Sequence, residues 1–191
     1  MPRGRLDLWE PLFERGRADA LFDDLWESVE WSQHWVRMGA RRLRCPRLSA
    51  WYGDRGALYR YSGQVYDPLP WIPPLDEVRR TVEEATGHGF NAVLLNAYRD
   101  GNDSMGWHSD DEKELGNRPV VASVSLGAAR RFRMRDRSRE HPAFGIELEH
   151  GSLLVMGEGT QEAWQHAVPR TRRPVGLRLN LTFRRIEDLA E

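Results

Sequence analysis

The run RLNLTFR at residues 178–184 alternates strictly between polar and apolar side chains. A β-strand turns successive side chains to opposite faces, so this period of two predicts a strand with one apolar and one polar face. The ordinary interpretation of such a strand places its polar face in solvent. The polar face here carries Arg178 and Arg184 at its two ends, however, and arginines so spaced suit bidentate binding of a dicarboxylate, one carboxylate at each end.

Short segments with the composition of β-strands also occupy much of the chain before this run. They cover residues 90–98, 120–126, 131–135, 145–148, 152–156 and 164–168, and the last strand is predicted over residues 177–183. Turn-rich segments such as RDGND (99–103) and GEGT (157–160) separate them. Many short strands with turns between them predict an all-β core, which could be a sandwich, a barrel or a jelly roll.

The first half of the chain has a different pattern, in which apolar residues recur at helical spacing. One amphipathic helix is predicted over residues 18–36, and a second begins at Pro73 and Pro74 and ends at Gly87. The apolar residues at helical spacing are Leu21, Leu25 and Val29 in the first helix and Leu75, Val78 and Val82 in the second. Residues 37–72 are rich in arginine, aromatic residues and glycine, and this composition predicts short strands and loops. We therefore expect an α+β fold that is mainly β.

The composition is that of an ordinary globular protein with one domain over residues 1–191, because 40% of the residues are hydrophobic and 30% are charged. No apolar run approaches the length that spans a membrane, and the first residues lack the apolar core of a signal peptide. Cys45 is the only cysteine, which excludes an intrachain disulfide and a cysteine-based zinc cluster. We expect a cytoplasmic monomer that does not contact a membrane.

Arginine is concentrated between residues 37 and 60, although the net charge of the whole chain is only −1. Seven arginines lie in this stretch against a single acid, Asp54: Arg37, Arg41, Arg42, Arg44, Arg47, Arg55 and Arg60. Arginine suits bidentate contacts with phosphate, so the stretch could follow a nucleic-acid backbone. A solvated face of the protein would have the same composition, and both interpretations remain open.

The segment His108-Ser109-Asp110 is a candidate metal site. In an extended segment residues i and i+2 point to the same side, so the imidazole and the carboxylate can converge. His166 lies in a later β-like run, and two histidines with one carboxylate form the triad that holds Fe(II) and leaves coordination positions open. A buried histidine that is simply hydrogen-bonded is the common alternative. The remaining histidines, His34, His88, His141 and His150, do not lie inside a patterned C-terminal strand.

Several motifs then occur in one order along the chain. They are NAY (96–98), HSDDE (108–112), SLGA (125–128), HGSLL (150–154), HAVP (166–169) and RLNLTFR (178–184). Together they resemble the AlkB family of nucleic-acid demethylases over about residues 45–186. Three upstream segments, YGD (52–54), YRYSG (59–63) and PWIP (70–73), are most similar to the animal DNA-repair members of that family.

This resemblance implies a fold and a division of the chain. The catalytic core would be a double-stranded β-helix (jelly roll) in residues 90–186. The N-terminal helices and a nucleotide-recognition segment would lie in residues 1–89 and pack on that core.

The resemblance also implies the cofactors and the residues that hold them. Fe(II) would be bound by His108, Asp110 and His166, with 2-oxoglutarate as co-substrate and O₂ as oxidant. The residues implied around 2-oxoglutarate are Asn96, Tyr98, Arg178, Asn180, Thr182 and Arg184. Among these, Arg178 would pair with the carboxylate far from the metal, helped by Tyr98, and Arg184 would approach the carboxylate near the metal.

The implied activity is oxidative demethylation of 1-methyladenine and 3-methylcytosine in DNA, in RNA or in both, which releases formaldehyde, succinate and CO₂. Tyr61 would stack on the flipped base with Tyr59 beside it, although aromatic residues at i and i+2 of a strand are also typical of a core. Glu112 would bind the exocyclic amine of the base. Arg47 would contact the nucleic-acid backbone.

Three other functions remain open at this point. A relative of the same enzyme class could act on a protein, a lipid or modified transfer RNA. A nucleic-acid-binding module could keep the fold without turnover. A hydrolase could use the same ligands for zinc, and a need for O₂ and 2-oxoglutarate would separate it from an oxygenase.

Overall fold

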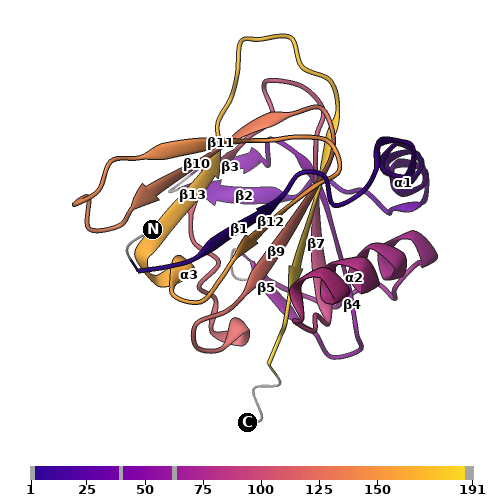
Figure 1. Cartoon of the computed structure of the whole chain (residues 1–191), viewed down its shortest axis with the longest axis horizontal. Helices are drawn as coiled ribbons and strands as arrows, with labels where there is room; N and C mark the ends of the chain where they lie inside the picture. Colours follow the sequence, from indigo (N-terminus) through magenta and orange to yellow (C-terminus); the bar gives the residue numbers. More distant parts are fainter. Residues whose placement is uncertain (1–2, 39–40, 62–63, 188–191) are drawn as a thin grey trace.

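A computed structural model describes residues 3–38, 41–61 and 64–187, and the side chains of residues 36–42 and 59–65 lie outside this description. Two antiparallel sheets pack face to face (Figure 1). The larger sheet has the order β1-β12-β9-β14-β7-β4, with β1 Leu6–Trp9, β4 Leu48–Gly53, β7 Ala92–Tyr98, β9 Val121–Gly127, β12 Ser152–Met156 and β14 Arg178–Arg184. The smaller sheet has the order β11-β10-β13-β8, with β8 Met105–His108, β10 Arg130–Asp136, β11 Phe144–Leu148 and β13 Trp164–Val168.

The strands from β7 to β14 pair in a nested way. The innermost pair is β10 with β11, followed outward by β9 with β12, β8 with β13 and β7 with β14. A long antiparallel ribbon wound into two facing sheets gives this arrangement, which is the jelly roll. The predicted double-stranded β-helix is therefore confirmed, and the wound ribbon brings β8, β13 and β14 around one interior.

The predicted strands agree with the observed ones to within about two residues at each end, but the sequence patterns did not indicate β1 or β8. The division expected at residue 89 does not follow the sheets, because the N-terminal part supplies strands at both edges of the larger sheet. There β1 pairs with β12, and β4 pairs with β7. The two parts of the chain also share one core cluster, in which Leu21 and Val78 are buried with Val93.

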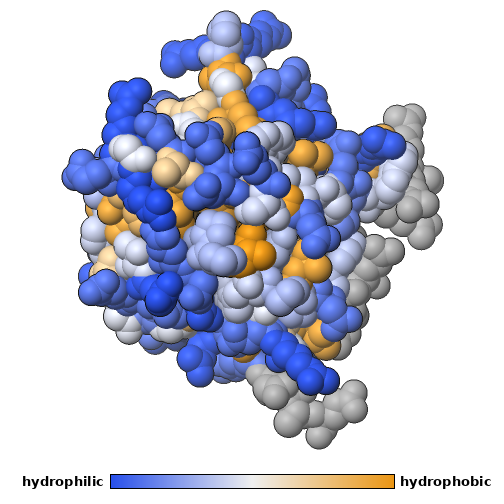
Figure 2. All heavy atoms as spheres, turned by 90° about the vertical axis from the view of Figure 1, so that its right-hand side faces the viewer, coloured by the Kyte–Doolittle hydropathy of each residue, from blue (hydrophilic) through white to orange (hydrophobic). Residues whose placement is uncertain are grey.

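Two helices, α1 (Arg15–Ser28) and α2 (Pro73–Thr86), cover the outer face of the larger sheet. The predicted second helix is confirmed, since Pro73 occupies the first turn and Gly87 ends the helix in the left-handed conformation at φ 72°. Fully burying a leucine or valine contributes about 1.5–3 kcal/mol, so the buried faces of these helices hold them on the sheet. Figure 2 shows this side of the molecule as mainly hydrophilic, with smaller hydrophobic patches.

The first helix is shorter than the predicted range of 18–36, because it ends at Ser28. After Val29 the chain is extended, and Ser32 exchanges two backbone hydrogen bonds with Ser49 at the edge of β4. Pairing with the sheet edge thus replaces the helical hydrogen bonds of this segment. His34, which the pattern placed in the helix, lies in this extended segment instead.

Two hairpins lie in residues 35–66, where short strands were expected. They are β2 (Trp35–Met38) with β3 (Arg41–Arg44) and β5 (Tyr59–Tyr61) with β6 (Gln64–Tyr66). Two short helical turns, η1 (Lys113–Leu115) and α3 (Thr160–Ala163), flank the strands that carry the candidate site. Within the described ranges, every helix is too short or too polar to cross a membrane.

Candidate metal and co-substrate site

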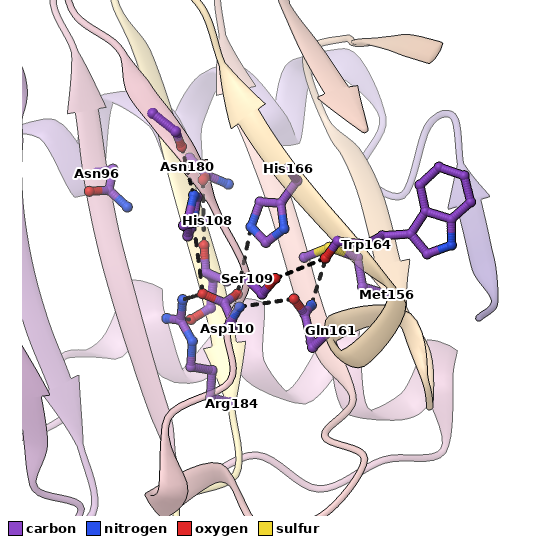
Figure 3. A network of polar contacts seen from close by, with 12 residues as sticks. Asn96, His108, Ser109, Asp110, Met156, Gln161, Trp164, His166, Asn180 and Arg184 are labelled. Atoms are coloured by element: carbon purple, nitrogen blue, oxygen red, sulfur yellow. Dashed lines mark hydrogen bonds and ion pairs between the residues drawn. The ribbon is translucent and has the colours of Figure 1, made fainter. Parts of the chain in front are cut away.

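The three candidate metal ligands meet between the two sheets. His108 is the last residue of β8 and lies directly opposite His166 of β13, while Asp110 follows β8 by two residues (Figure 3). The ligand atoms of the three side chains all lie within 4.8 Å of one another. His108 Nε2 and His166 Nε2 each lie 3.9 Å from one oxygen of the Asp110 carboxylate. Two histidines and a carboxylate therefore converge on one point, as expected.

The hydrogen bonding of these side chains fits a metal ion. Within the described residues, the buried Asp110 Oδ2 has no hydrogen-bond partner, and leaving a buried acceptor unsatisfied costs about 1–3 kcal/mol. His108 Nδ1 lies 2.9 Å from the Gly106 carbonyl oxygen, so a proton on Nδ1 donates to that oxygen and leaves the Nε2 lone pair facing Asp110. This donor set of two imidazoles and one carboxylate suits Fe(II).

Protonation states also favour metal binding. Burial alone would raise the pKa of the Asp110 carboxyl, but nearby Arg184, together with His166 and His108, holds this pKa well below its usual range. Burial, with the charges of His108 and Arg184, lowers the pKa of His166 to about 3 against the opposing effect of Asp110. At neutral pH, Asp110 is therefore a carboxylate and His166 a neutral imidazole, which are the forms that bind metal.

The polar face of β14 points into the protein and not into solvent. Every residue of this strand is buried, including Arg178 at 1% exposure and Arg184 at 3%. Asn180 and Thr182 line one cavity with the triad residue Asp110. The ordinary interpretation of the strand, a solvent-facing polar side, is thus wrong, and the alternation instead lines the interior of the jelly roll.

Arg178 is a buried cation with unused donors. Its Nη2 donates to Ser125 Oγ at 2.9 Å, whereas Nε and Nη1 have no hydrogen-bond partner within the described part of the chain. Burial lowers its pKa to about 10, so the group stays protonated at neutral pH. Tyr98 lies opposite it in the register of β7, with the guanidinium carbon 5.3 Å from the ring centroid. A buried guanidinium with donors that have no partner suits the binding of a carboxylate.

Arg184, at the other end of the row, lies beside the metal ligands. Its Nη2 donates to Asp110 Oδ1 at 2.9 Å, and both side chains are buried. The position agrees with the predicted place near the metal. The structure adds that Arg184 holds one oxygen of Asp110, which leaves Oδ2 turned toward His166.

The smaller polar residues of the predicted co-substrate set have partners inside the protein. Asn180 Nδ2 donates to Ser123 Oγ at 2.8 Å, and Thr182 Oγ1 donates to Asn180 Oδ1 at 3.4 Å. Asn96, across the ladder from Asn180, accepts a hydrogen bond from Arg47 Nε at 2.8 Å. These contacts order the wall of the cavity.

Comparisons with known proteins bear on this site. A family model described as 2OG-Fe(II) oxygenase superfamily matches residues 8–184. The Bos taurus protein named DNA oxidative demethylase ALKBH2 is 42% identical over 185 residues, which are 92% of this chain and 66% of that protein. The Mus musculus protein of the same name is also 42% identical and is covered to 77%. The Rattus norvegicus alpha-ketoglutarate-dependent dioxygenase alkB homolog 3 is 42% identical over 95% of this chain and 64% of that protein.

The chain belongs to the AlkB family. It spans about two thirds of the length of the bovine and rat relatives. The solved structure of OsALKBH1 superposes with a TM-score of 0.66 at 20% identity and covers 97% of this chain and 98% of that one, which shows a shared fold. Family membership brings Fe(II) and 2-oxoglutarate as cofactor and co-substrate, and the triad described above fits them.

On the side expected to bind the base, Glu112 of this AlkB-family protein is half-buried. Its Oε2 is buried without a hydrogen-bond partner within the described residues, and burial raises the pKa of its carboxyl against the opposing effect of Arg184. The Oε2 atom of Glu112 is therefore an acceptor that a ligand could use. The backbones of Tyr59 and Tyr61 form β5, but their side chains lie outside the described residues, so their stacking role stays a prediction.

Arg47 does not lie where a contact with the nucleic-acid backbone was expected. Its side chain is buried at 6% exposure and donates to Asn96 inside the protein. The reason is that β4, which begins at Leu48, lies beside β7 and brings this arginine to the interior edge of the sheet. Arg47 instead lines a cavity of about 170 Å³ that adjoins the triad cavity through Leu94 and Asn96.

Some residues of the site had no signal in the sequence pattern of this AlkB-family chain. Gln161 in α3 accepts a hydrogen bond from the Asp110 backbone, and Ser109 donates to the Trp164 carbonyl. Arg130 is buried, and its guanidinium lies 5.6 Å from the Tyr98 ring centroid. Gln161 sits in the polar stretch TQEA, which resembles an exposed turn, so only the packing of the strands reveals its burial.

Proposed function

We propose that this AlkB-family protein repairs alkylated DNA by oxidative demethylation of 1-methyladenine and 3-methylcytosine. One observation carries the proposal. The triad of His108, Asp110 and His166 lies inside the jelly roll together with Arg178, a buried guanidinium whose Nε and Nη1 have no hydrogen-bond partner among the described residues. A metal site alone would suit many reactions. A metal site beside a receptor for a dicarboxylate suits an oxygenase that uses 2-oxoglutarate.

When bound here, Fe(II) with 2-oxoglutarate and O₂ supplies oxidation of the N-methyl group, with release of formaldehyde, succinate and CO₂. His108, Asp110 and His166 would hold the metal. Arg178 would bind the carboxylate of 2-oxoglutarate that lies away from the metal through its free Nε and Nη1, with Tyr98 beside it. Arg184 donates to Oδ1 of Asp110, so Oδ2 would be the oxygen left to bind the metal.

The substrate side of the proposal rests on Glu112 and on the adjoining cavity. The two lesions carry positive charge and pair poorly, so flipping them out of the stack costs less than flipping a normal base. Glu112 is half-buried, and its Oε2, which has no partner among the described residues, would accept a hydrogen bond from the exocyclic amine of such a base. Tyr61 and the His108 ring would enclose the base, with Tyr59 beside it.

Release of formaldehyde from oligonucleotides tests the proposal. The purified protein with Fe(II), 2-oxoglutarate and O₂ is given single-stranded and duplex DNA that carries 1-methyladenine or 3-methylcytosine, with RNA of the same sequence in parallel. We expect formaldehyde and succinate in equal amounts, and only in the presence of O₂. Succinate formation without formaldehyde from any methylated oligonucleotide would place the substrate elsewhere, in a protein, a lipid or transfer RNA. If no succinate forms, the result would favour a nucleic-acid-binding module that has the fold but no turnover.

Two variants test the assignment of the ligands. Replacement of His108 or His166 by alanine removes one of three metal ligands, and we expect turnover to fall below detection while the fold is retained. Circular dichroism and thermal unfolding check the fold. Turnover in either variant would contradict the assignment. The cytoplasmic location and the monomeric state stay predictions, which fractionation and analytical ultracentrifugation can check.

A further inference from the structure

The backbone that carries Asp110 is not part of a sheet. The strand β8 ends at His108, and its register with β13 shifts between His166 and Val168. Asp110 therefore lacks the ladder hydrogen bonds that fix His108 and His166, although its side chain must meet theirs within a few ångströms. Some other contact has to hold this peptide in place.

Gln161 provides that contact from α3, the short turn that precedes β13. Its side chain is buried at 1% exposure, and its Oε1 accepts a hydrogen bond from the Asp110 backbone N–H at 2.9 Å. On its other side Nε2 lies 3.4 Å from Met156 Sδ, which fixes the orientation of the amide (Figure 3). The Gln161 amide thus connects Met156 of β12 to the backbone of Asp110.

Two neighbouring contacts tie the same loop to the same turn. Ser109 Oγ donates to the Trp164 carbonyl oxygen at 2.9 Å. Arg137 Nη1 lies 2.9 Å from Asp111 Oδ2 and 3.4 Å from the Gln161 carbonyl oxygen. The Arg137–Asp111 pair is exposed, and Ser109 bonds Trp164 through its own side chain, so none of these contacts reaches the Asp110 peptide. Gln161 alone of this set bonds the peptide of Asp110 itself.

We propose that Gln161 is a positioning residue for metal binding, acting through the Asp110 peptide. Arg184 holds Oδ1 of Asp110 from one side, and Gln161 holds its backbone from the other. In this arrangement Oδ2 lies 3.9 Å from His166 Nε2. Outer contacts of this kind usually change metal affinity or activity by about 10–100-fold when removed. The inference rests on the proposed metal site and adds to it a residue that does not touch the metal.

Binding of Mn(II) without 2-oxoglutarate tests the inference, because it needs no turnover. The free Mn(II) signal in electron paramagnetic resonance gives the dissociation constant for the unmodified protein, Gln161→Leu and Gln161→Glu. We expect Gln161→Leu to weaken binding by about tenfold or more. Gln161→Glu keeps an oxygen that accepts from the Asp110 N–H but loses the contact with Met156, so it should weaken binding less than Gln161→Leu does.

Gln165→Leu is the matched control. Gln165 precedes the ligand His166 in β13, but its Oε1 bonds Arg135 Nε on the outer face, so its loss should leave the dissociation constant unchanged. Should Gln161→Leu not fold, Gln161→Asn, which keeps the amide but shortens its reach, should show the same loss. If Gln161→Leu, or Gln161→Asn in its place, binds Mn(II) as tightly as the unmodified protein, the positioning role alone is overturned. Absence of Mn(II) binding by the unmodified protein would overturn the metal site as well.

Discussion

At the scale of single residues, Arg178 shows how burial turns an ordinary side chain into a binding group. In solvent an arginine satisfies all five N–H donors with water. Here burial leaves Nε and Nη1 without a hydrogen-bond partner in the described structure, while Ser125 takes Nη2. Burying donors without a partner costs free energy, and a bound anion would offset that cost. The same reasoning applies to the unsatisfied Oδ2 of Asp110 and a metal.

Replacement of Arg178 should therefore affect the co-substrate first. A hydrogen bond to a charged group contributes about 1.5–3 kcal/mol, so Arg178→Met should raise the KM for 2-oxoglutarate by about tenfold or more, with a smaller change in kcat. Steady-state kinetics with varied 2-oxoglutarate measure both. Arg131→Met removes an arginine of the smaller sheet whose partner, Glu147, is exposed, and it should leave KM unchanged. An unchanged KM in Arg178→Met would refute the role assigned to this residue.

At the scale of elements, local pattern and pairing compete. At the end of α2 the local pattern decides, because Gly87 adopts the left-handed conformation that ends the helix where the sequence predicts it. The end of α1 shows the opposite, since apolar spacing extends the helix to residue 36 but pairing of Ser32 with Ser49 stops it earlier. The turn between β7 and β8 is a third case, in which Asp103 receives three hydrogen bonds from Arg99 and orders the loop that leads to His108.

Alanine at two glycines should have opposite effects on stability. Gly87 has φ 72° with no atom near an added Cβ, so Gly87→Ala adds only backbone strain and should lower the free energy of unfolding by about 1 kcal/mol. Gly16 lies in α1 without positive φ and with equally open space, so Gly16→Ala should raise it, by up to about 1 kcal/mol. Denaturant titration measures both. A Gly87→Ala variant at least as stable as the unmodified protein would contradict this account of Gly87.

Loss of the Asp103 carboxylate should make stability less dependent on pH. Burial alone would raise the pKa of Asp103, but the hydrogen bonds and charge of Arg99 outweigh it and lower the pKa from 3.8. A carboxyl whose pKa is lower in the folded state stabilises above its ordinary pKa and loses that contribution as the pH falls. Asp103→Asn should cost about 1–2 kcal/mol at pH 7, a modest value because Arg99 is 44% exposed. The difference from the unmodified protein should shrink below about pH 4. A constant difference across the acid range would rule this out.

At the scale of the whole molecule, the nested pairing of the jelly roll assembles the site. His108 and His166 come from β8 and β13, which are distant in the chain but paired in the smaller sheet, and Arg184 comes from β14 of the larger sheet. Each sheet contributes part of the site, so binding there should stabilise the fold as a unit. The N-terminal strands β1 and β4 are the two edge strands of the larger sheet, so the N-terminal part of the chain belongs to the same fold.

Metal should consequently raise the melting temperature of the whole protein. A ligand that binds only the folded state at about 100 times its dissociation constant adds about 2.7 kcal/mol. We expect Mn(II) to raise Tm by several degrees, and a chelator to reverse the shift. His166→Ala should show no shift with Mn(II). A similar rise in Tm for His166→Ala would indicate that the metal binds elsewhere.

By itself the sequence determined most of the strands, the second helix and the residue types of the candidate site. The alternation of β14, the caps of α2 and the presence of two histidines with one aspartate follow from residue types at short spacing, because strand and helix periods are local properties. Only the tertiary structure decided which face of β14 is interior, that Arg47 is buried against Asn96, and that Asp110 lies beyond its strand and is held by Gln161. These depend on which strands become neighbours, and that is set by burial and pairing over the whole chain.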